Sequence, residues 1–218
     1  MKRKSKKYLR SKRLKNPRKI RVKALPDKKL WKKHNLLAGV DEAGRGPLAG
    51  PVVASAVILP KNFYHPEIDD SKKLSVVKRE KLYKIITKVA LSYSFGIVEP
   101  SIIDKINILN ATKLAMQEAI NSLNPKPEII LIDALKIADI PYQQIALIKG
   151  DTLSLSIASA SILAKVRRDA IMLEYHKVYP RYQFNKHKGY PTKLHRQCIK
   201  EHGPCPIHRK TFRLLQHR

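Results

Sequence analysis

From residue 36 onward, short apolar runs that end at polar turns alternate with longer amphipathic stretches. Short apolar runs bounded by turn residues are typical of buried strands, whereas apolar residues at three- and four-residue spacing are typical of helices. The pattern therefore predicts strands at 36–40, 51–59, 91–98, 128–133 and 145–151, and helices at 71–90, 101–123 and 154–179. The block 181–218 is only weakly patterned, and we expect it to form a basic, helical C-terminal part.

The order of these elements predicts an α/β fold with a mixed sheet. Only a glycine- and proline-containing turn separates 36–40 from 51–59, which is too short for a crossover helix, so these two strands should pair antiparallel. The last two strands alternate with helical segments, which favours parallel pairing in that half. We expect one domain over residues 34–218, because a second full domain would be a tight fit in a chain of 218 residues.

The chain is strongly basic, with 45 Lys and Arg against 17 Asp and Glu and a net charge of +28. A polyanion is therefore the expected partner, with nucleic acid ahead of an anionic membrane surface. No apolar run approaches the roughly 20 residues that cross a bilayer, and no apolar core of a signal peptide follows the basic start. We expect a cytoplasmic protein without a membrane partner, and a transit peptide is the less favoured alternative.

Residues 1–33 form a separate compositional block, in which 17 Lys and Arg accompany a single acid, Asp27. So many like charges and so few apolar residues predict a disordered N-terminal extension. Two interpretations of this extension stay open: an electrostatic arm that binds nucleic acid, which we favour, and a solubilising tail.

Acidic residues recur at the predicted strand ends of this otherwise basic chain. Asp41 follows the first strand and is followed by Glu42, and Asp133 and Asp151 end the fourth and fifth strands. Strand ends that share one edge of a sheet meet in space, and carboxylates held together repel unless a cation neutralises them. All-oxygen ligands favour Mg²⁺ or Mn²⁺. The pattern favours two-metal phosphodiester cleavage of nucleic acid.

Two alternatives without catalysis stay open beside this hypothesis. Any one of these acids by itself could be a turn residue. A non-catalytic basic protein that binds RNA or DNA would explain the charge equally well, but it gives no reason for acids at three strand ends.

Three further motifs suggest other chemistry, and we set each aside. The segment GRGPLAG resembles a dinucleotide-binding turn but is followed by a strand, so no helix N-terminus is available for a pyrophosphate. Ser161 and Lys165 are one residue too far apart for the S-x-x-K motif and are expected to be ordinary surface or packing residues.

The third is a group of possible zinc ligands near the C-terminus, formed by His195, Cys198, His202, Cys205 and His208. The two cysteines are seven positions apart, which is wider than in common zinc knuckles, and prolines at 204 and 206 disturb any helix that would carry ligands. We expect ordinary surface histidines. Two cysteines in a domain of this size also indicate a reducing compartment.

Six segments of the chain resemble, in order and spacing, the motifs of ribonuclease HII, the type 2 ribonuclease H. They are AGVDEAGRGPLAGPVVASAVIL (38–59), DDSKKLS (69–75), INILNATKLAM (106–116), LIDALKI (131–137), KGDTLSLSIASASILAKVRRD (149–169) and HKGYPT (187–192). The resemblance covers about residues 36 to 212. It implies the ribonuclease H fold, a mixed five-stranded sheet flanked by helices.

The resemblance also implies an endonuclease activity. The expected enzyme hydrolyses the RNA strand of RNA·DNA hybrids and nicks ribonucleotide-containing duplex DNA on the 5′ side of the ribonucleotide, leaving 3′-hydroxyl and 5′-phosphate ends. The family's four catalytic and metal-binding acids correspond to Asp41, Glu42, Asp133 and Asp151, with Mn²⁺ or Mg²⁺ as cofactor. A monomer is the simpler expectation for the oligomeric state.

Substrate contacts are implied in the same way. Gly44, Arg45 and Gly46 match the loop whose backbone recognises the 2′-hydroxyl, and Tyr190 matches the tyrosine that packs on the following deoxyribose. Lys72 and Lys73 are candidates for phosphate contacts, with a solvent-facing pair at a helix start as the equal alternative. Two segments depart from the family pattern, 1–33 and 201–210, so the resemblance implies no role for either.

Overall fold

The computed structural model describes residues 24–138 and 140–215. Its strands are β1 (Leu37–Ala43), β2 (Val52–Ile58), β3 (Ser92–Val98), β4 (Ile129–Asp133) and β5 (Gln143–Leu147). Its α-helices are α2 (Leu25–Trp31), α3 (Val76–Val89), α4 (Pro100–Asn121), α5 (Gly150–Leu153), α6 (Leu155–Val178), α7 (Phe184–His187) and α8 (Lys193–His202). Two short 3-10 helices, η1 (Ser71–Lys73) and η2 (Pro180–Tyr182), complete the described part.

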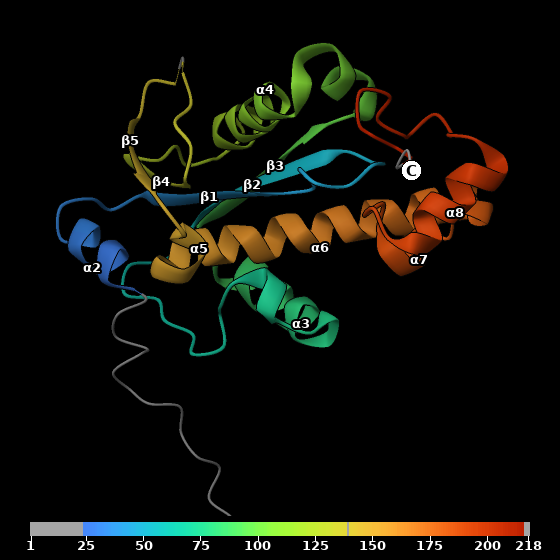
Figure 1. Cartoon of the computed structure of the whole chain (residues 1–218). Helices are drawn as coiled ribbons and strands as arrows, with labels where there is room; N and C mark the ends of the chain where they lie inside the picture. Colours follow the sequence, from blue (N-terminus) through green and yellow to red (C-terminus); the bar gives the residue numbers. More distant parts are fainter. Residues whose placement is uncertain (1–23, 139, 216–218) are drawn as a thin grey trace, which may run out of the picture.

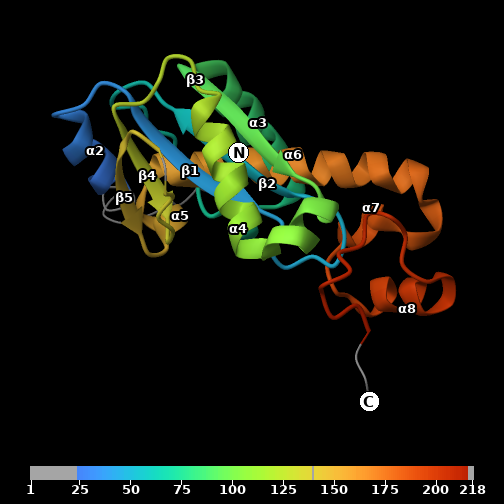
Figure 2. The same ribbon diagram turned by 90° about the horizontal axis from the view of Figure 1, so that it is seen from above.

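The five strands form one mixed sheet in the order β3-β2-β1-β4-β5. The first three strands pair antiparallel, and β4 and β5 add to β1 in parallel. The antiparallel pairing of β1 with β2 and the parallel pairing of β4 with β5 confirm the prediction from the sequence. Helix α4 covers one face of the sheet, and α6 with α3 covers the other, so the molecule has three layers (Figures 1 and 2). A hydrophobic cluster fills each interface between layers.

Strand β1 shows how alternation in the sequence builds both layers. Ala38 and Val40 pack in the cluster beneath α4, whereas Leu37 packs in the cluster beneath α6. Gly39 faces α6 so closely that an added Cβ would lie 2.1 Å from the backbone carbon of Ser156. The small Ser and Ala face of α6 therefore rests directly on β1, as the sequence indicated.

Two predicted boundaries next to the acids are wrong. Strand β1 continues to Ala43, so Asp41 lies within the strand rather than at its end. Strand β5 ends at Leu147, and Lys149 adopts a left-handed conformation (φ 58°) that turns the chain into the short helix α5. Asp151 therefore lies in the first turn of that helix, because the apolar run that suggested a strand continues through the turn.

The predicted extension 1–33 is also wrong over its last ten residues, while residues 1–23 lie outside the described residues. Leu25–Trp31 forms helix α2, with Pro26 in its first turn. Trp31 is 3% exposed in the cluster beneath α6, and Asp27 is fully buried. One apolar anchor and one well-placed acid outweigh the repulsion among the surrounding lysines, which are exposed.

The C-terminal part is more ordered than its weak pattern suggested. Helices α7 and α8 lie beyond the end of the sheet, next to the last turns of α6 (Figure 2). They enclose a third, smaller cluster that includes Tyr182, Phe184 and Met172. Within the described residues, no helix has both the length and the apolar character that a membrane span requires.

Candidate active site

Asp41 and Asp133 lie side by side on the α6 face of the sheet. Strands β1 and β4 run parallel with Val40 opposite Ile132, so the next residue of each strand is one of these acids. Neighbouring strands are about 4.8 Å apart, and residues at the same level of adjacent strands point to the same face. Asp41 is 5% exposed, and Asp133 is half-buried. The sheet therefore brings together two carboxylates that 92 positions separate in the sequence.

Asp151 is joined to this pair through the turn after β5. The amide of Gly150 donates a hydrogen bond of 2.7 Å to Oδ1 of Asp133, and Asp151 follows directly. Gly150 has no room for a side chain, because a Cβ would lie 2.6 Å from Cδ1 of Ile157 and 3.3 Å from the Asp133 carboxylate. The glycine thus allows the turn to close against the end of β4.

The acids repel one another electrostatically. Burial raises the pKa of Asp41 well above its usual value, and the charges of Glu42 and Asp133 raise it further. Burial also raises the pKa of Glu42, with Asp133 adding to the effect and Arg45 opposing it. Arg45 Nη1 lies 3.4 Å from Oε1 of Glu42.

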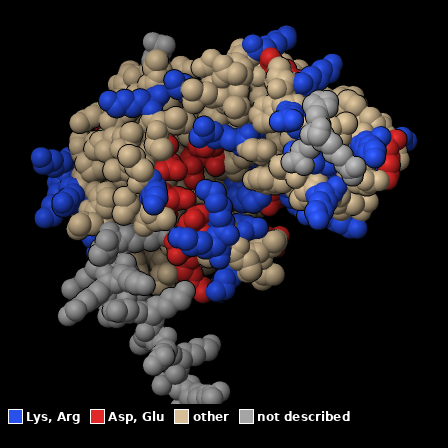
Figure 3. All heavy atoms as spheres, in the orientation of Figure 1, with Lys and Arg blue, Asp and Glu red and all other residues tan. Residues whose placement is uncertain are grey.

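Asp151 is subject to the same repulsion. Burial raises the pKa of Asp151, and the charges of Asp70 and Asp133 add to it, while Lys72 and Lys73 oppose it. The structure thus brings all four predicted acids together, since the charge of Asp133 acts on each of the other three. Acidic side chains gather at the centre of one face, with basic side chains beside them (Figure 3).

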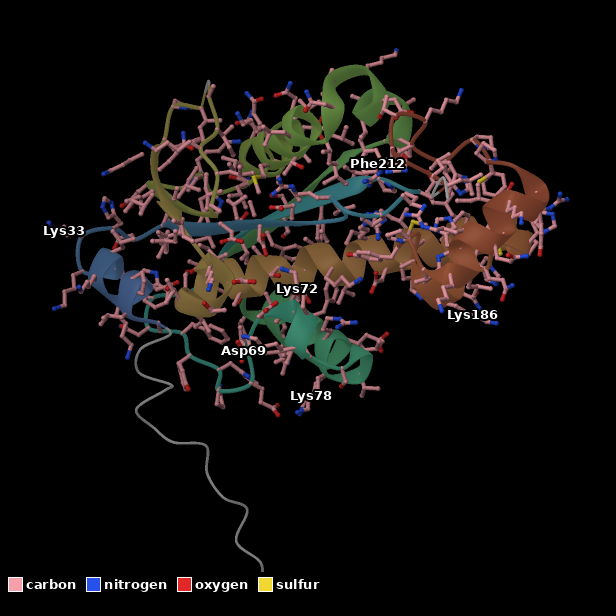
Figure 4. All side chains as sticks on the ribbon, in the orientation of Figure 1. Lys33, Asp69, Lys72, Lys78, Lys186 and Phe212 are labelled. Carbon is pink, nitrogen blue, oxygen red and sulfur yellow. The ribbon has the colours of Figure 1, made fainter. Side chains whose placement is uncertain are left out.

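Lys72 lies at the edge of this acidic group. The Nζ atom of Lys72 is 3.8 Å from Oδ2 of Asp151. In the view of Figure 4, Lys72 lies near the middle of the molecule. Partial burial lowers the pKa of Lys72, but the carboxylates around it outweigh this effect and raise the pKa overall. Lys73 instead lies 3.8 Å from Oδ2 of Asp70. The Lys72 side chain is 80% exposed, so it is accessible to an anionic ligand.

Ser161 is a site residue that the sequence analysis assigned to the surface or to packing. It is 3% exposed, and its hydroxyl forms a hydrogen bond of 2.9 Å with the hydroxyl of Ser71. The Ser161 hydroxyl also acts on Asp41, whose pKa it lowers against the larger effect of burial. Lys165, its rejected partner, instead forms an ion pair of 2.7 Å with Asp169. A small polar residue facing the sheet from α6 was the only signal that the sequence offered.

The glycine-rich loop follows β1 directly and so lies next to the acids. Gly44 and Gly50 have positive φ angles of 102° and 83°, which other residues rarely adopt. Gly46 has open space where a Cβ would be, and Arg45 is exposed. Leu48 donates a hydrogen bond of 2.8 Å to the carbonyl of Gly189 and so joins this loop to the segment that carries Tyr190.

Tyr190 presents a partly exposed ring beside the loop, with 37% of the residue accessible. Lys165 Nζ lies 5.3 Å and the guanidinium carbon of Arg168 5.7 Å from the ring centroid. The backbone carbonyl of Tyr190 accepts a hydrogen bond of 3.0 Å from Nδ1 of His195. The predicted sugar-contacting elements are thus neighbours in space.

His195 and His208 are not surface residues, which corrects that expectation for these two, whereas His202 is exposed as expected. His195 and His208 are 0% and 1% exposed, and their Nε2 atoms are 3.0 Å apart. The amide of Cys205 donates to Nδ1 of His208, which leaves the Nε2 proton of His208 to bond with Nε2 of His195. Burial lowers the pKa of both histidines to about 4, so both are neutral at pH 7. Neutral rings linked in this way fill the core of the C-terminal part.

The donor set at the acids fits a hard divalent cation, since it consists of carboxylate oxygens whose repulsion a cation would relieve. Among residues 24–138 and 140–215, no three His, Cys, Asp or Glu side chains are grouped so that they could hold one ion. Mg²⁺ is commonly held by one or two carboxylates together with substrate phosphates and water. Asp41 and Asp133 provide such a pair.

Solved structures with the same fold define the class of this protein. Ribonuclease H2 from Pyrococcus horikoshii matches with a TM-score of 0.68 and 29% identity, over 82% of this chain and 94% of that one. The ribonuclease HII in a complex with PCNA from Archaeoglobus fulgidus matches with a TM-score of 0.68 and 27% identity, over 84% and 98%. The fold is therefore the α/β ribonuclease H-like fold.

The sequence matches a family within this class. The ribonuclease HII profile matches residues 38–215. Ribonuclease HII of Caldanaerobacter subterraneus subsp. tengcongensis is 59% identical over 187 residues, which cover 85% of this chain and 78% of that protein. Ribonuclease HII of Syntrophus aciditrophicus is 55% identical over 181 residues, which cover 83% and 85%. The chain belongs to the ribonuclease HII family.

Family membership settles the general activity. The protein is a metal-dependent ribonuclease H endonuclease that acts on RNA-containing nucleic acid and cleaves the RNA strand of RNA·DNA hybrids. The alternative of a non-catalytic basic binding protein is therefore wrong. The strongly basic composition is consistent with this substrate.

Proposed function

We propose that this endonuclease also incises duplex DNA on the 5′ side of a single embedded ribonucleotide and leaves 3′-hydroxyl and 5′-phosphate ends. The observation that carries the proposal is the adjacency of Asp41 and Asp133 on one face of neighbouring strands, directly before a loop in which Arg45 and Gly46 are exposed. A hydrolytic site beside a short, open loop suits a substrate in which one sugar differs from its neighbours.

The four acids Asp41, Glu42, Asp133 and Asp151 hold two Mn²⁺ or Mg²⁺ ions in this proposal. Ions bound there supply activation of the attacking water and stabilisation of the departing oxygen. Burial, together with repulsion from neighbouring carboxylates, raises the pKa of Asp41, Glu42 and Asp151, and this supports the assignment because a cation would relieve the repulsion. The buried hydroxyl of Ser161 favours the ionised form of Asp41, which is the form that binds a cation.

Substrate recognition is divided among three elements. The backbone of Gly44, Arg45 and Gly46 contacts the 2′-hydroxyl, because main-chain groups approach a sugar closely where glycine leaves space. The exposed ring of Tyr190 packs on the following deoxyribose, where an additional hydroxyl would crowd it. Lys72 and Lys73 contact phosphates, and residues 1–23 attract the duplex electrostatically to a monomeric enzyme.

A labelled duplex that contains one ribonucleotide tests the proposal. With Mn²⁺ or Mg²⁺ the protein should nick this duplex at one position, 5′ of the ribonucleotide, and should leave the all-DNA duplex intact. Chelation with EDTA should abolish the cut. A DNA polymerase should extend the upstream product, because extension requires a 3′-hydroxyl.

The variant Asp41→Asn separates catalysis from binding. It should retain affinity for the duplex and lose cutting by at least a thousandfold, or about 4 kcal/mol in the activation free energy. Glu174→Gln is the matched control, because Glu174 pairs with Lys177 on an exposed face of α6 and its loss should not change cutting. Cutting that persists without metal, or in Asp41→Asn, would refute the mechanism.

A further inference from the structure

Two fully buried arginines, Arg168 in α6 and Arg209 near the C-terminus, lie beneath the glycine-rich loop. In the part of the chain that the structure describes, neither guanidinium has a carboxylate within ion-pair distance. A buried charge without an ionic partner is unfavourable unless hydrogen bonds compensate for it. The arrangement of those hydrogen bonds therefore indicates what the two charges hold in place.

Arg209 binds three carbonyls of the loop. Its Nη2 donates to the carbonyls of Gly44 (2.6 Å) and Gly50 (2.8 Å), its Nη1 donates to that of Arg45 (3.0 Å), and its Nε also donates to Gly50 (3.0 Å). Gly44 and Gly50 are the two loop residues with positive φ angles. One rigid, planar group thus holds both ends of the loop in their unusual conformations.

The direction of these carbonyls determines the direction of the neighbouring amides. In a trans peptide the C=O of one residue and the N–H of the next point in opposite directions. Because Arg209 draws the carbonyls of Gly44 and Arg45 inward, the amides of Arg45 and Gly46 are turned outward. Neither amide donates to an acceptor among residues 24–138 and 140–215. Two backbone donors are therefore available to a ligand on the exposed side of the loop.

Arg168 also binds the C-terminal end of the loop and joins it to the segment of Tyr190. Its Nε donates to the carbonyl of Pro51, its Nη2 to that of Ala49 and its Nη1 to that of Lys188, each at 3.0 Å. Its guanidinium carbon also lies 5.7 Å from the centroid of the Tyr190 ring. A single side chain therefore sets the separation between the loop and the ring.

We propose that Arg209 and Arg168 are positioning residues for sugar recognition: Arg209 directs the amides of Arg45 and Gly46 toward the 2′-hydroxyl, and Arg168 sets the distance from these amides to Tyr190. This proposal rests on the proposed function of the loop and the ring. Both arginines are fully buried, so they act through the carbonyls and the ring that they contact rather than by touching the substrate.

Substitution by lysine tests the role of Arg209. Arg209→Lys keeps a positive charge but cannot reach three carbonyls at once. Per folded molecule, it should lower kcat/KM for the single-ribonucleotide duplex ten- to hundredfold. The preference for ribose over 2′-fluororibose at the cleavage site should fall to a similar extent. Affinity for an all-DNA duplex should stay within twofold of wild type. Arg167→Lys is the matched control, since Arg167 is the exposed neighbour of Arg168 on α6.

A second experiment tests the role of Arg168 separately. Arg168→Lys should reduce the preference for a single-ribonucleotide duplex over a continuous RNA·DNA hybrid, because only the former places deoxyribose against Tyr190. The same substitution should have no such effect in a Tyr190→Ala background. Equal effects in both backgrounds would overturn the role of Arg168.

The outcomes separate this inference from the proposed function. If wild type cuts at the ribonucleotide and Arg209→Lys changes only the melting temperature, with an unchanged ribose preference per folded molecule, the positioning role is wrong and the proposed function stands. Should Arg209→Lys fail to fold, Arg209→Gln provides the same comparison with two donors. If wild type does not cut at the ribonucleotide, the proposed function itself is wrong.

Discussion

The carboxylate of Asp27 accepts a hydrogen bond of 2.9 Å from the amide of Ser156, although 129 positions separate the two residues. The same side chain accepts hydrogen bonds from the amide of Leu155 and the hydroxyl of Ser154, both at 3.1 Å. A buried acid in the N-terminal helix thus caps the N-terminus of α6, where free amides and the helix dipole favour a negative charge. Helix α6 in turn carries Ser161 to the acids.

Replacing Asp27 should therefore destabilise the whole domain. Asp27→Ala leaves buried amides of α6 without acceptors, and we expect the free energy of unfolding to fall by about 2–4 kcal/mol. Urea denaturation followed by circular dichroism measures this change. Lys29→Gln, an exposed change on the same helix, should alter the free energy of unfolding by less than about 0.5 kcal/mol. Similar values for the two variants would contradict the capping role.

Deletion of residues 1–23 should weaken substrate binding without unfolding the domain. This segment contains 13 Lys and Arg and no acid, so its removal should flatten the dependence of log K on log salt. The cleavage position should stay the same. Binding isotherms at several salt concentrations provide the measurement, and an unchanged slope would favour the solubilising tail.

A longer deletion, of residues 1–33, provides the contrast. It also removes Asp27 and Trp31, both of which are buried, and should lower the melting temperature markedly. A melting temperature equal to that of the shorter deletion would show that α2 contributes nothing to stability.

Lys72→Gln should reduce cutting through weaker contact with phosphate. We expect kcat/KM for the ribonucleotide duplex to fall about tenfold and the salt slope of binding to decrease by about one. Lys78→Gln removes the same charge from a lysine on the outer side of α3 and should leave both quantities unchanged (Figure 4). Equal effects of the two substitutions would mean that Lys72 acts only through the general field of the protein.

Acid should destabilise the domain through its buried histidines. The unfolded chain protonates histidine below about pH 6.5, whereas His195 and His208 remain neutral in the folded state down to about pH 4. Each of these histidines therefore lowers the free energy of unfolding by about 1.4 kcal/mol per pH unit as the pH falls from 6.5 to 4. Denaturation curves across this range measure the slope.

The variant His208→Asn isolates one of these groups. The amide oxygen of the new Asn side chain can replace Nδ1 as acceptor for the amide of Cys205. The slope of unfolding free energy against pH should decrease by about 1.4 kcal/mol per pH unit, which corresponds to one proton. His202→Gln, which changes an exposed histidine, should not alter the slope. An unchanged slope in His208→Asn would show that this residue does not titrate on unfolding.

Much of the fold follows from local pattern. Short apolar runs at 36–40 and 128–133 predict two of the strands. The connections between elements predict the direction in which strands pair, because a short turn and a helical crossover each permit one geometry. The side-by-side placement of Asp41 and Asp133 depends in addition on β1 and β4 being neighbours in the sheet, which the connections do not specify. The local pattern did not predict the position of Asp151, since an apolar run does not show where a strand ends and the following turn begins.

The local sequence pattern does not predict which polar residues are buried. Burial of Asp27, His195, Arg168 and Arg209 contradicts what their residue types suggest, because polar groups are normally solvated. Each is buried only because partners from distant segments satisfy it, such as the carbonyls that surround the two arginines.

The sequence by itself determined the class of elements and the pairing direction of the first two strands, and it singled out four acids that the fold brings together, since periodicity and motif spacing are properties of the chain. The tertiary structure alone decided which buried polar groups support the site. Hydrogen bonds between segments more than a hundred positions apart depend on how layers pack, and packing orients the loop and caps the helix beside the acids.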